Sequence, residues 1–258
     1  MGHLVHHTSG IKNWTSVLWD MRWPYTDRIA FEQIVRMAHV QKELNFVPGT
    51  KYQYSNTGYV LLAAIVEAVT GESFADWTKD NVFAPLSMDH TFFKDDRYQL
   101  IPHLAGSYFL DGDGNEVRDA NNTTALGSSS LISNGTDMRK WMNFLMSPPP
   151  GKRAIVTRML TTKPLNDGSD NSYAYGIDVG EYRGTRYITH SGSWASHTSQ
   201  LVLLPDLDTS LFIAHNFRTN TGYLINRYVD TLLPQVASDT ERENSSSEPE
   251  AVVPLSDA

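Results

Sequence analysis

The sequence predicts an α+β fold, in which helices come first and one block of antiparallel strands follows. Apolar residues recur at three- and four-residue spacing in several segments of the first 150 residues, the pattern of amphipathic helices. Between residues 173 and 215, four short segments rich in β-branched and aromatic residues are separated by turn residues. Strands joined so closely can pair only antiparallel. Helices and strands segregated in this way indicate α+β rather than alternating α/β.

Two helices are expected before residue 72. Asp27 is the expected cap of the first, which Pro48 and Gly49 close. The second and stronger helix follows Asn56, and Gly71 is placed to end it. The apolar positions at helical spacing are Phe31, Ile34, Val35 and Ala38 in the first helix and Tyr59, Leu62, Ala63 and Val66 in the second.

Two more helices are expected before the strands. Ser73 and Asp76 resemble a capping box, and the helix that they begin must end before Pro85. Thr136 precedes the next helix, which a run of three prolines from Pro148 ends. The apolar positions of that helix are Met138, Trp141, Met142 and Leu145.

The strands are expected at 173–179, 186–189, 198–204 and 210–215. A final helix carries Ile225, Tyr228, Val229 and Leu232. Residues 1–237 are therefore expected to form one domain.

Residues 238–258 read as a disordered acidic tail. They contain no aromatic residue and six acidic residues against Arg242 alone. The chain carries a formal charge of −8, of which −5 belongs to this tail and −3 to the remainder. An acidic chain is a poor candidate for binding the phosphate backbone, so no nucleic-acid partner is expected.

Several kinds of site are excluded by the residues present. The absence of cysteine excludes disulfides, thiolate nucleophiles and zinc–thiolate centres. No G-x-S-x-G, H-E-x-x-H or phosphate-binding loop occurs. The run from Asp111 to Asn115 begins like a calcium loop, but Glu116 stands where glycine is needed, so a hairpin turn is expected. His3, His6 and His7 read as an adventitious cluster, and no cofactor or metal is expected.

Two tripeptides remain as candidates for chemistry. Tyr54-Ser55-Asn56 lies in a loop directly before the strongest helix, and His190-Ser191-Gly192 lies at the end of a predicted strand. Each is weak evidence alone, because Asn56 could simply cap the helix and a strand-end turn would explain the second tripeptide.

Their surroundings make the pair specific. The ordered series is HHTSGI (6–11), FVPGTKYQYSNTGYVLLAAIVEAVTG (46–71), VFAPLSM (82–88), GSSSLISNGTDMRKW (127–141) and HSGSWASHTSQLVLLPD (190–206). Together these segments closely resemble the serine β-lactamase-like family, which comprises class C β-lactamases, penicillin-binding DD-peptidases and related esterases and D-aminopeptidases. The resemblance spans residues 4 to 234.

The resemblance implies a β-lactamase/transpeptidase-like fold, with an antiparallel sheet flanked by helices and a helical subdomain. It implies acyl transfer through an acyl-serine intermediate on a peptide, β-lactam or ester substrate. Tyr54 matches the tyrosine that moves the proton, and Asn56 matches the asparagine that binds the substrate amide. His190 and Gly192 match the strand that lines the acyl site, and histidine in place of lysine there is common in the esterase and peptidase branches. Ser191 and Trp194 are the further substrate-binding candidates.

The nucleophile of the family, a serine with a lysine in S-x-x-K, lies upstream of the HTSG motif. Here that motif begins at His7, so the chain is expected to be N-terminally truncated. The only S-x-x-K string is Ser9 to Lys12, which reads as a turn, since Gly10 is a poor residue for a helix interior. The nucleophile is therefore unknown, and little or no activity is expected of this chain alone. The alternative is a non-catalytic protein that binds a peptide or peptidoglycan-like ligand.

Loss of the upstream segment is also expected to expose an apolar face and a sheet edge. Self-association and marginal stability would follow. The longest mainly apolar stretch, 59–69, is far shorter than the ~20 residues that cross a bilayer, so no transmembrane segment is expected. No signal-peptide pattern is visible, and although the family is mostly extracytoplasmic or secreted, the sequence leaves the compartment open.

Overall fold

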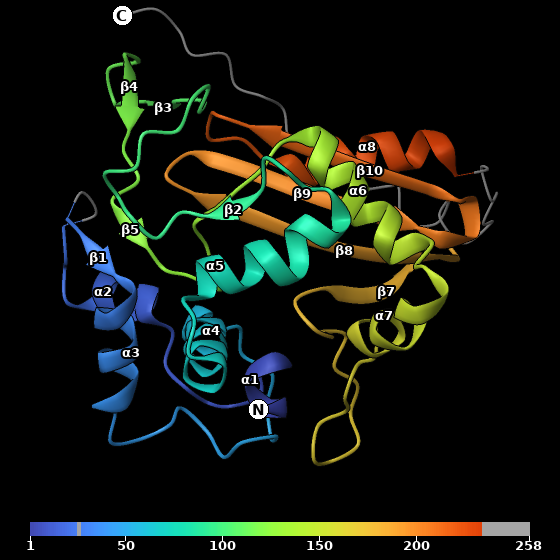
Figure 1. Ribbon diagram of the computed structural model, residues 1–258, viewed down its shortest axis with the longest axis horizontal. Helices are drawn as coiled ribbons and strands as arrows, with labels where there is room; N and C mark the ends of the chain where they lie inside the picture. The colour runs from blue at the N-terminus through green and yellow to red at the C-terminus, as the bar shows by residue number, and fades with distance from the viewer. Residues whose placement is uncertain (25–26, 234–258) are drawn as a thin grey trace, which may run out of the picture.

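A four-stranded antiparallel sheet is the largest element of the structure, a computed structural model that describes residues 1–24 and 27–233 (Figure 1). The predicted tail, 238–258, lies outside the described residues. The helices are α1 (Gly2–Val5), α2 (Trp14–Asp20), α3 (Phe31–His39), α4 (Asn56–Thr70), α5 (Phe74–Thr78), α6 (Gly135–Met146), α7 (Arg153–Met159) and α8 (Thr221–Leu232). The strands are β1 (Ile29–Ala30), β2 (Phe92–Phe93), β3 (Ser107–Leu110), β4 (Glu116–Asp119), β5 (Thr123–Thr124), β6 (Leu131–Ile132), β7 (Asp178–Tyr182), β8 (Thr185–Trp194), β9 (His197–Leu204) and β10 (Thr209–His215).

The main sheet has the strand order β10-β9-β8-β7, with every pair antiparallel, as the sequence predicts. Three of the four predicted strands correspond to β8, β9 and β10. The first prediction was wrong, because β7 begins at Asp178 and Tyr173 makes only an isolated bridge to it. A turn causes the difference: Ala174 N–H donates to Ile177 C=O, and Gly176 has φ +77°. The aromatic and β-branched residues before β7 are therefore buried in an irregular segment.

Helices cover both faces of this sheet (Figure 1). Successive residues of β9 point to opposite faces. Leu203 packs with Met142 and Leu145 of α6, whereas Val202 and Leu204 pack with α8. Apolar residues on both sides thus give the sheet two cores. A third core joins α3, α4 and β1 in the helical part, which lies below the sheet in Figure 1; its members are Trp14, Ile29, Phe31, Ile34, Val60, Ala63, Ala125 and Leu126.

Helix α4 begins and ends where the sequence predicts, with Asn56 as its first residue and Gly71 as its C-cap at φ 76°. Ser73 caps α5 through a hydrogen bond from Asp76 N–H, which is also as predicted. The segment after α5 continues as a π-helix, 79–83, and a 3-10 turn, 84–86, so the α-helix does end before Pro85.

One predicted cap was wrong. Asp27 does not cap α3, because the helix starts at Phe31 and the Gln33 side chain accepts from Ala30 N–H. Thr136, which was expected to precede α6, lies inside it, because α6 begins at Gly135 and Asn134 caps it. At the start of α3, the Gln33 side chain from inside the helix thus accepts from a free N–H group, a task that the sequence suggested for Asp27 before the helix.

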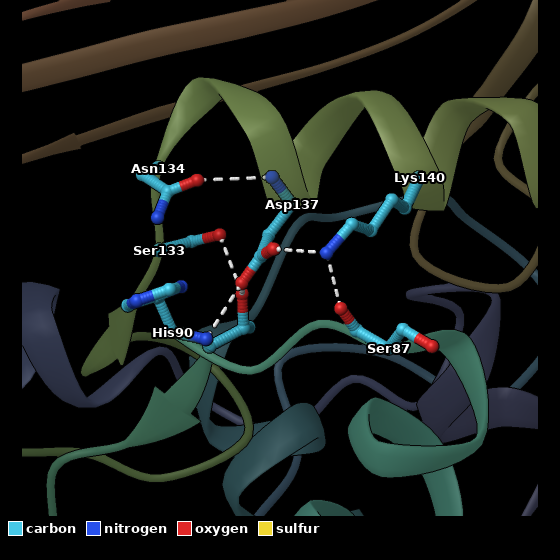
Figure 2. Close-up of polar contacts among 7 residues, drawn as sticks. Ser87, His90, Ser133, Asn134, Asp137 and Lys140 are labelled. Atoms are coloured by element: carbon cyan, nitrogen blue, oxygen red, sulfur yellow. Dashed lines mark hydrogen bonds and ion pairs between the residues drawn. The ribbon is translucent and has the colours of Figure 1, made fainter.

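The buried Asp137 joins α6 to the loop before β2 (Figure 2). Its carboxylate accepts hydrogen bonds from His90 N–H at 2.8 Å and from the Thr91 hydroxyl at 3.0 Å. Lys140, one turn along α6, forms an ion pair with it at 3.0 Å and also donates to the Ser87 carbonyl. The Asp137 side chain is 0% exposed, so these donors replace its lost contact with water.

Strand β10 pairs only with β9 among the described residues, so one side of it is a sheet edge. The expected exposure of an edge through loss of an upstream segment, and self-association through it, both stay predictions. Among the described residues no single helix could span a membrane. One bent pair, α4 with the helical stretch 74–86 at 87°, reaches the required length and apolarity only when the two are taken together.

Candidate functional site

The fold brings the loop before α4 against strand β8, so the two candidate tripeptides lie together. The ring centroids of Tyr54 and His190 are 6.4 Å apart. Tyr54 is 40% exposed, and His190 is half-buried. The tripeptide at 190–192 is not at a strand end, because β8 continues to Trp194.

Tyr173 connects these two side chains. Its hydroxyl shares a hydrogen bond of 2.9 Å with His190 Nε2, and its ring lies 6.0 Å from that of Tyr54. Only 2% of Tyr173 is exposed, because the turn before β7 carries it inward. Through this hydrogen bond, the buried Tyr173 fixes the orientation of the His190 ring.

Burial governs the protonation of this cluster. Burial raises the pKa of Tyr54 above the usual 10, and the negative charge of Asp178 raises this pKa further. A hydrogen bond with Tyr173 lowers the pKa of Tyr54 but does not outweigh these two effects. Burial likewise raises the pKa of Tyr173 and lowers that of His190, although Asp178 opposes the second shift. At neutral pH the cluster therefore holds protonated tyrosines and a neutral imidazole.

Asn56 is the first residue of α4, directly after the Tyr54 loop. Its backbone N–H donates to Asn13 Oδ1 at 3.2 Å, so Asn13 rather than Asn56 satisfies this helix end. Thr57 also ties the start of α4 to the N-terminal segment, through its hydroxyl to the Lys12 carbonyl at 2.8 Å. The alternative interpretation of Asn56 as a helix cap is therefore not supported, and its part in the site stays a prediction.

Strand β8 has an open edge next to this cluster. Its pairing with β7 ends at Thr189, while its pairing with β9 continues to Trp194. Among the residues that the structure describes, the last five of β8 therefore have no strand on the β7 side. Ser191 and Gly192 are exposed there, and a Cβ on Gly192 would lie 3.0 Å from Ser199 Oγ.

Trp194 is the last residue of β8, at the end of this open edge. Its ring packs 5.5 Å from that of Trp14 against the helical core, and its Nε1 donates to Asn121 Oδ1 at 3.0 Å. These contacts give Trp194 a packing role, and its part in ligand binding stays a prediction.

The string from Ser9 to Lys12 has no helix. Gly10 has φ +75°, and the Ser9 hydroxyl accepts from Ile11 N–H at 3.3 Å within a turn. Ser9 is buried, whereas Lys12 is exposed. The two side chains consequently do not share a helix face, which supports the interpretation of this string as a turn.

The sequence marks His7 only as part of the HTSG motif, and Tyr173 only as the start of an expected strand. The structure places His7 and Tyr173 in contact, with ring centroids 4.4 Å apart, and Tyr59 joins them. The motif was the one signal for His7, and Tyr173 lies outside the quoted motifs, because contacts across such sequence separations leave no local pattern.

The described residues form no metal site at this cluster, and two cavities lie elsewhere. Within residues 1–24 and 27–233, no group of three or more His, Asp or Glu side chains is placed to hold a metal ion. Two cavities, of about 540 and 610 Å³, lie beside α6 and α7 instead. The tyrosine cluster and the open edge of β8 are therefore the candidate functional site.

An α+β fold that sets a Tyr-x-Asn loop, at the start of a core helix, beside a His-x-Gly strand defines the β-lactamase/transpeptidase-like class. The family model described as Beta-lactamase matches residues 1–233, so this chain belongs to the beta-lactamase family. The fold and family expected from the sequence are thus confirmed.

Among the curated relatives are a protein named as a penicillin-binding protein and one named as a D-aminopeptidase. The chain is 28% identical over 240 residues to penicillin-binding protein 4* of Bacillus subtilis, covering 86% of this chain and 52% of the relative. It is 28% identical over 186 residues to a D-aminopeptidase of Brucella canis, covering 70% of this chain and 35% of that protein. The chain thus spans between a third and about half of these curated relatives.

Solved structures share the fold. The octameric penicillin-binding protein homologue from Pyrococcus abyssi has a TM-score of 0.76 at 24% identity, over 89% of this chain and 54% of that one. The D-amino acid amidase from Ochrobactrum anthropi, complexed with D-phenylalanine, has a TM-score of 0.69 at 21% identity, over 89% of this chain and 70% of that chain.

Proposed function

We propose that this chain carries the tyrosine and strand half of a serine-hydrolase site, which transfers an acyl group from a peptide, β-lactam or ester to a serine. The single observation that carries the proposal is the meeting of Tyr54 with His190 beside an open strand edge. In this proposal Tyr54 passes a proton to the leaving group and Asn56 binds the substrate amide. The N–H groups of β8 around Ser191 and Gly192 bind the acyl carbonyl.

The serine and its lysine come from outside Ser9–Lys12 in this proposal. A tyrosine with a raised pKa is a poor base until a cation stabilises its phenolate. The charge that acts on Tyr54 among the described residues is the anion Asp178, which has the opposite effect. Because no cation acts on Tyr54 among the described residues, the proposal includes that the 258-residue chain alone has little or no acyl-transfer activity.

The proposed substrates are amides of D-amino acids. Two matched proteins are named as a D-aminopeptidase and a D-amino acid amidase, and histidine at position 190 is typical of the peptidase and esterase branches. The open edge of β8 suits an extended backbone, which can add to it as a further strand.

The second candidate is a non-catalytic protein that binds a peptide or peptidoglycan-like ligand. The same open edge favours it, because β-strand addition needs no nucleophile. Neither candidate predicts a covalent adduct on residues 1–258, and the test at the end of the Discussion would contradict both if one formed.

A D-alanyl-D-alanine amide peptide is expected to shift the backbone N–H signals of residues 191–193 in NMR titrations. Tyr54→Phe, which removes only a hydroxyl, is expected to weaken binding about tenfold through loss of one hydrogen bond. Tyr98→Phe is the matched control, since Tyr98 is 72% exposed, and it should bind as the parent does. Shifts confined to the cavities beside α6, or equal binding by both variants, would overturn this site.

A further inference from the structure

His7, from the HTSG motif, holds both neighbours of Tyr54. Gln53 N–H donates to the His7 carbonyl at 2.9 Å, and Ser55 N–H donates to His7 Nδ1 at 3.1 Å. Tyr54 is thus the centre of a three-residue segment fixed at each end by the same residue. Both hydrogen bonds are explained if His7 holds the Tyr54 loop in place, without any direct part in the proposed reaction.

The second bond determines the state of the imidazole. A nitrogen that accepts a hydrogen bond carries no proton, so the neutral ring has its proton on Nε2. His7 is 1% exposed, and burial, followed by the charges of His190 and His6, lowers its pKa to about 4. The ring is therefore neutral at physiological pH, which keeps Nδ1 available as an acceptor.

The ring also packs against the tyrosines of the site. Its centroid lies 4.1 Å from that of Tyr54, 4.4 Å from Tyr173 and 5.1 Å from Tyr59. Its Nε2 atom is buried without a hydrogen-bond partner in the described structure. His7 also has φ +53°, a left-handed conformation that few residues other than glycine adopt but that histidine, asparagine and aspartate adopt more often than most. An unsatisfied buried polar atom next to a candidate reactive group points to a function beyond packing.

We propose that His7 is the positioning residue of the site, which uses its carbonyl and Nδ1 to hold the Tyr54 loop so that the phenol faces β8. This inference rests on the proposed function of Tyr54 in proton transfer. The inference adds that the position of Tyr54 during proton transfer depends on the neutral imidazole of His7, which packs against the Tyr54 ring. A displacement of about 1 Å at a reacting group can cost about a hundredfold in rate, so such a support has a large effect.

Packing alone is the competing explanation, and a matched pair of variants separates the two. His7→Asn and His7→Gly both tolerate the left-handed backbone and both remove the ring. Only asparagine offers an oxygen near the place of Nδ1. The pair therefore differs in the acceptor, and urea unfolding of both variants measures how far they also differ in packing.

The first readout is the free, full-length chain in NMR. The parent is expected to show His7 as the Nε2–H tautomer from pH 8 down to about 5, consistent with its pKa. Exchange of the Ser55 amide hydrogen is expected to be about tenfold faster in His7→Gly and largely restored in His7→Asn. An Nδ1–H tautomer, or equal Ser55 exchange in the two variants, would overturn the proposal.

The second readout is affinity for the D-alanyl-D-alanine amide peptide. His7→Gly is expected to bind about tenfold more weakly than His7→Asn, at similar midpoints of urea unfolding. His39→Asn, on the exposed end of α3, is the control and should match the parent. If no variant and no parent binds the peptide, the proposed function fails while the Ser55 readout still decides whether His7 holds the loop. If both variants bind equally, the positioning role fails alone.

Discussion

Replacing Asp137 by alanine is expected to lower the free energy of unfolding by about 2–3 kcal/mol, because it removes a buried carboxylate and leaves its hydrogen-bond donors without this acceptor. His90 N–H loses its partner, whereas the Thr91 hydroxyl keeps its hydrogen bond of 2.8 Å with the Ser133 hydroxyl. Lys140 loses its partner but retains the Ser87 carbonyl (Figure 2). Urea unfolding of the parent and the variant at pH 7 measures the difference.

Asp89→Ala is the control for this change. Asp89 is an exposed carboxylate near the same loop, and its removal is expected to alter stability by less than about 0.5 kcal/mol. Equal losses in the two variants would show that general charge, not the buried network, sets the stability.

The loss at Asp137 should also depend on pH. Burial raises the pKa of this carboxyl, but Lys140, His90 N–H and Thr91 outweigh it, so the pKa lies below the usual 3.8. A depressed folded-state pKa stabilises the protein above the unfolded value and ceases to do so as the pH falls through the folded one. The gap between parent and Asp137→Ala should therefore be full at pH 7 and narrow below about pH 4. A gap that widens on acidification would contradict the ion-pair explanation.

Gly127→Ala is expected to cost about 3 kcal/mol, from a left-handed backbone and a steric clash combined. Gly127 has φ +82°, and a Cβ there would lie 2.4 Å from the Tyr59 carbonyl and 2.9 Å from Ala63 Cβ. Both neighbours belong to α4, so the helix must shift or distort. Because α4 begins directly after Tyr54, the variant should also weaken peptide binding.

Gly71→Ala separates the two causes of that loss. Gly71 has φ +76°, but no atom lies within 4 Å of an added Cβ. Only the backbone cost, about 1 kcal/mol, is expected there. Circular dichroism melts of both variants would test this, and a loss at Gly71 as large as that at Gly127 would contradict the clash.

Much of the fold follows from local pattern. Helix α4 has a strong apolar face and a glycine stop, and β9 and β10 have β-branched and aromatic residues bounded by turns. Helix α2 lacks such signals, since no side chain caps it and its one buried residue is Trp14. It is held instead by a distant contact, in which Trp14 N–H donates to the Thr57 hydroxyl at 2.8 Å.

In the candidate site, too, some residues could be predicted from the sequence and others could not. Tyr54 and His190 were predicted through motifs, and the sheet then brings them together. The supporting contacts of His7 and Tyr173 could not be predicted, because they are hydrogen bonds to residues 48 and 17 positions away. Only the fold determines which loop faces which strand.

Intact-mass spectrometry after exposure to a fluorescent penicillin and to an activated ester tests the central claim most directly. That claim is that residues 1–258 form a ligand-binding half-site in which Ser9 is not the nucleophile. The predicted result is an unchanged mass, together with reversible peptide binding that Tyr54→Phe weakens. A stoichiometric adduct mapped to Ser9, and lost in Ser9→Ala, would contradict it. The acyl group would then be transferred within these residues.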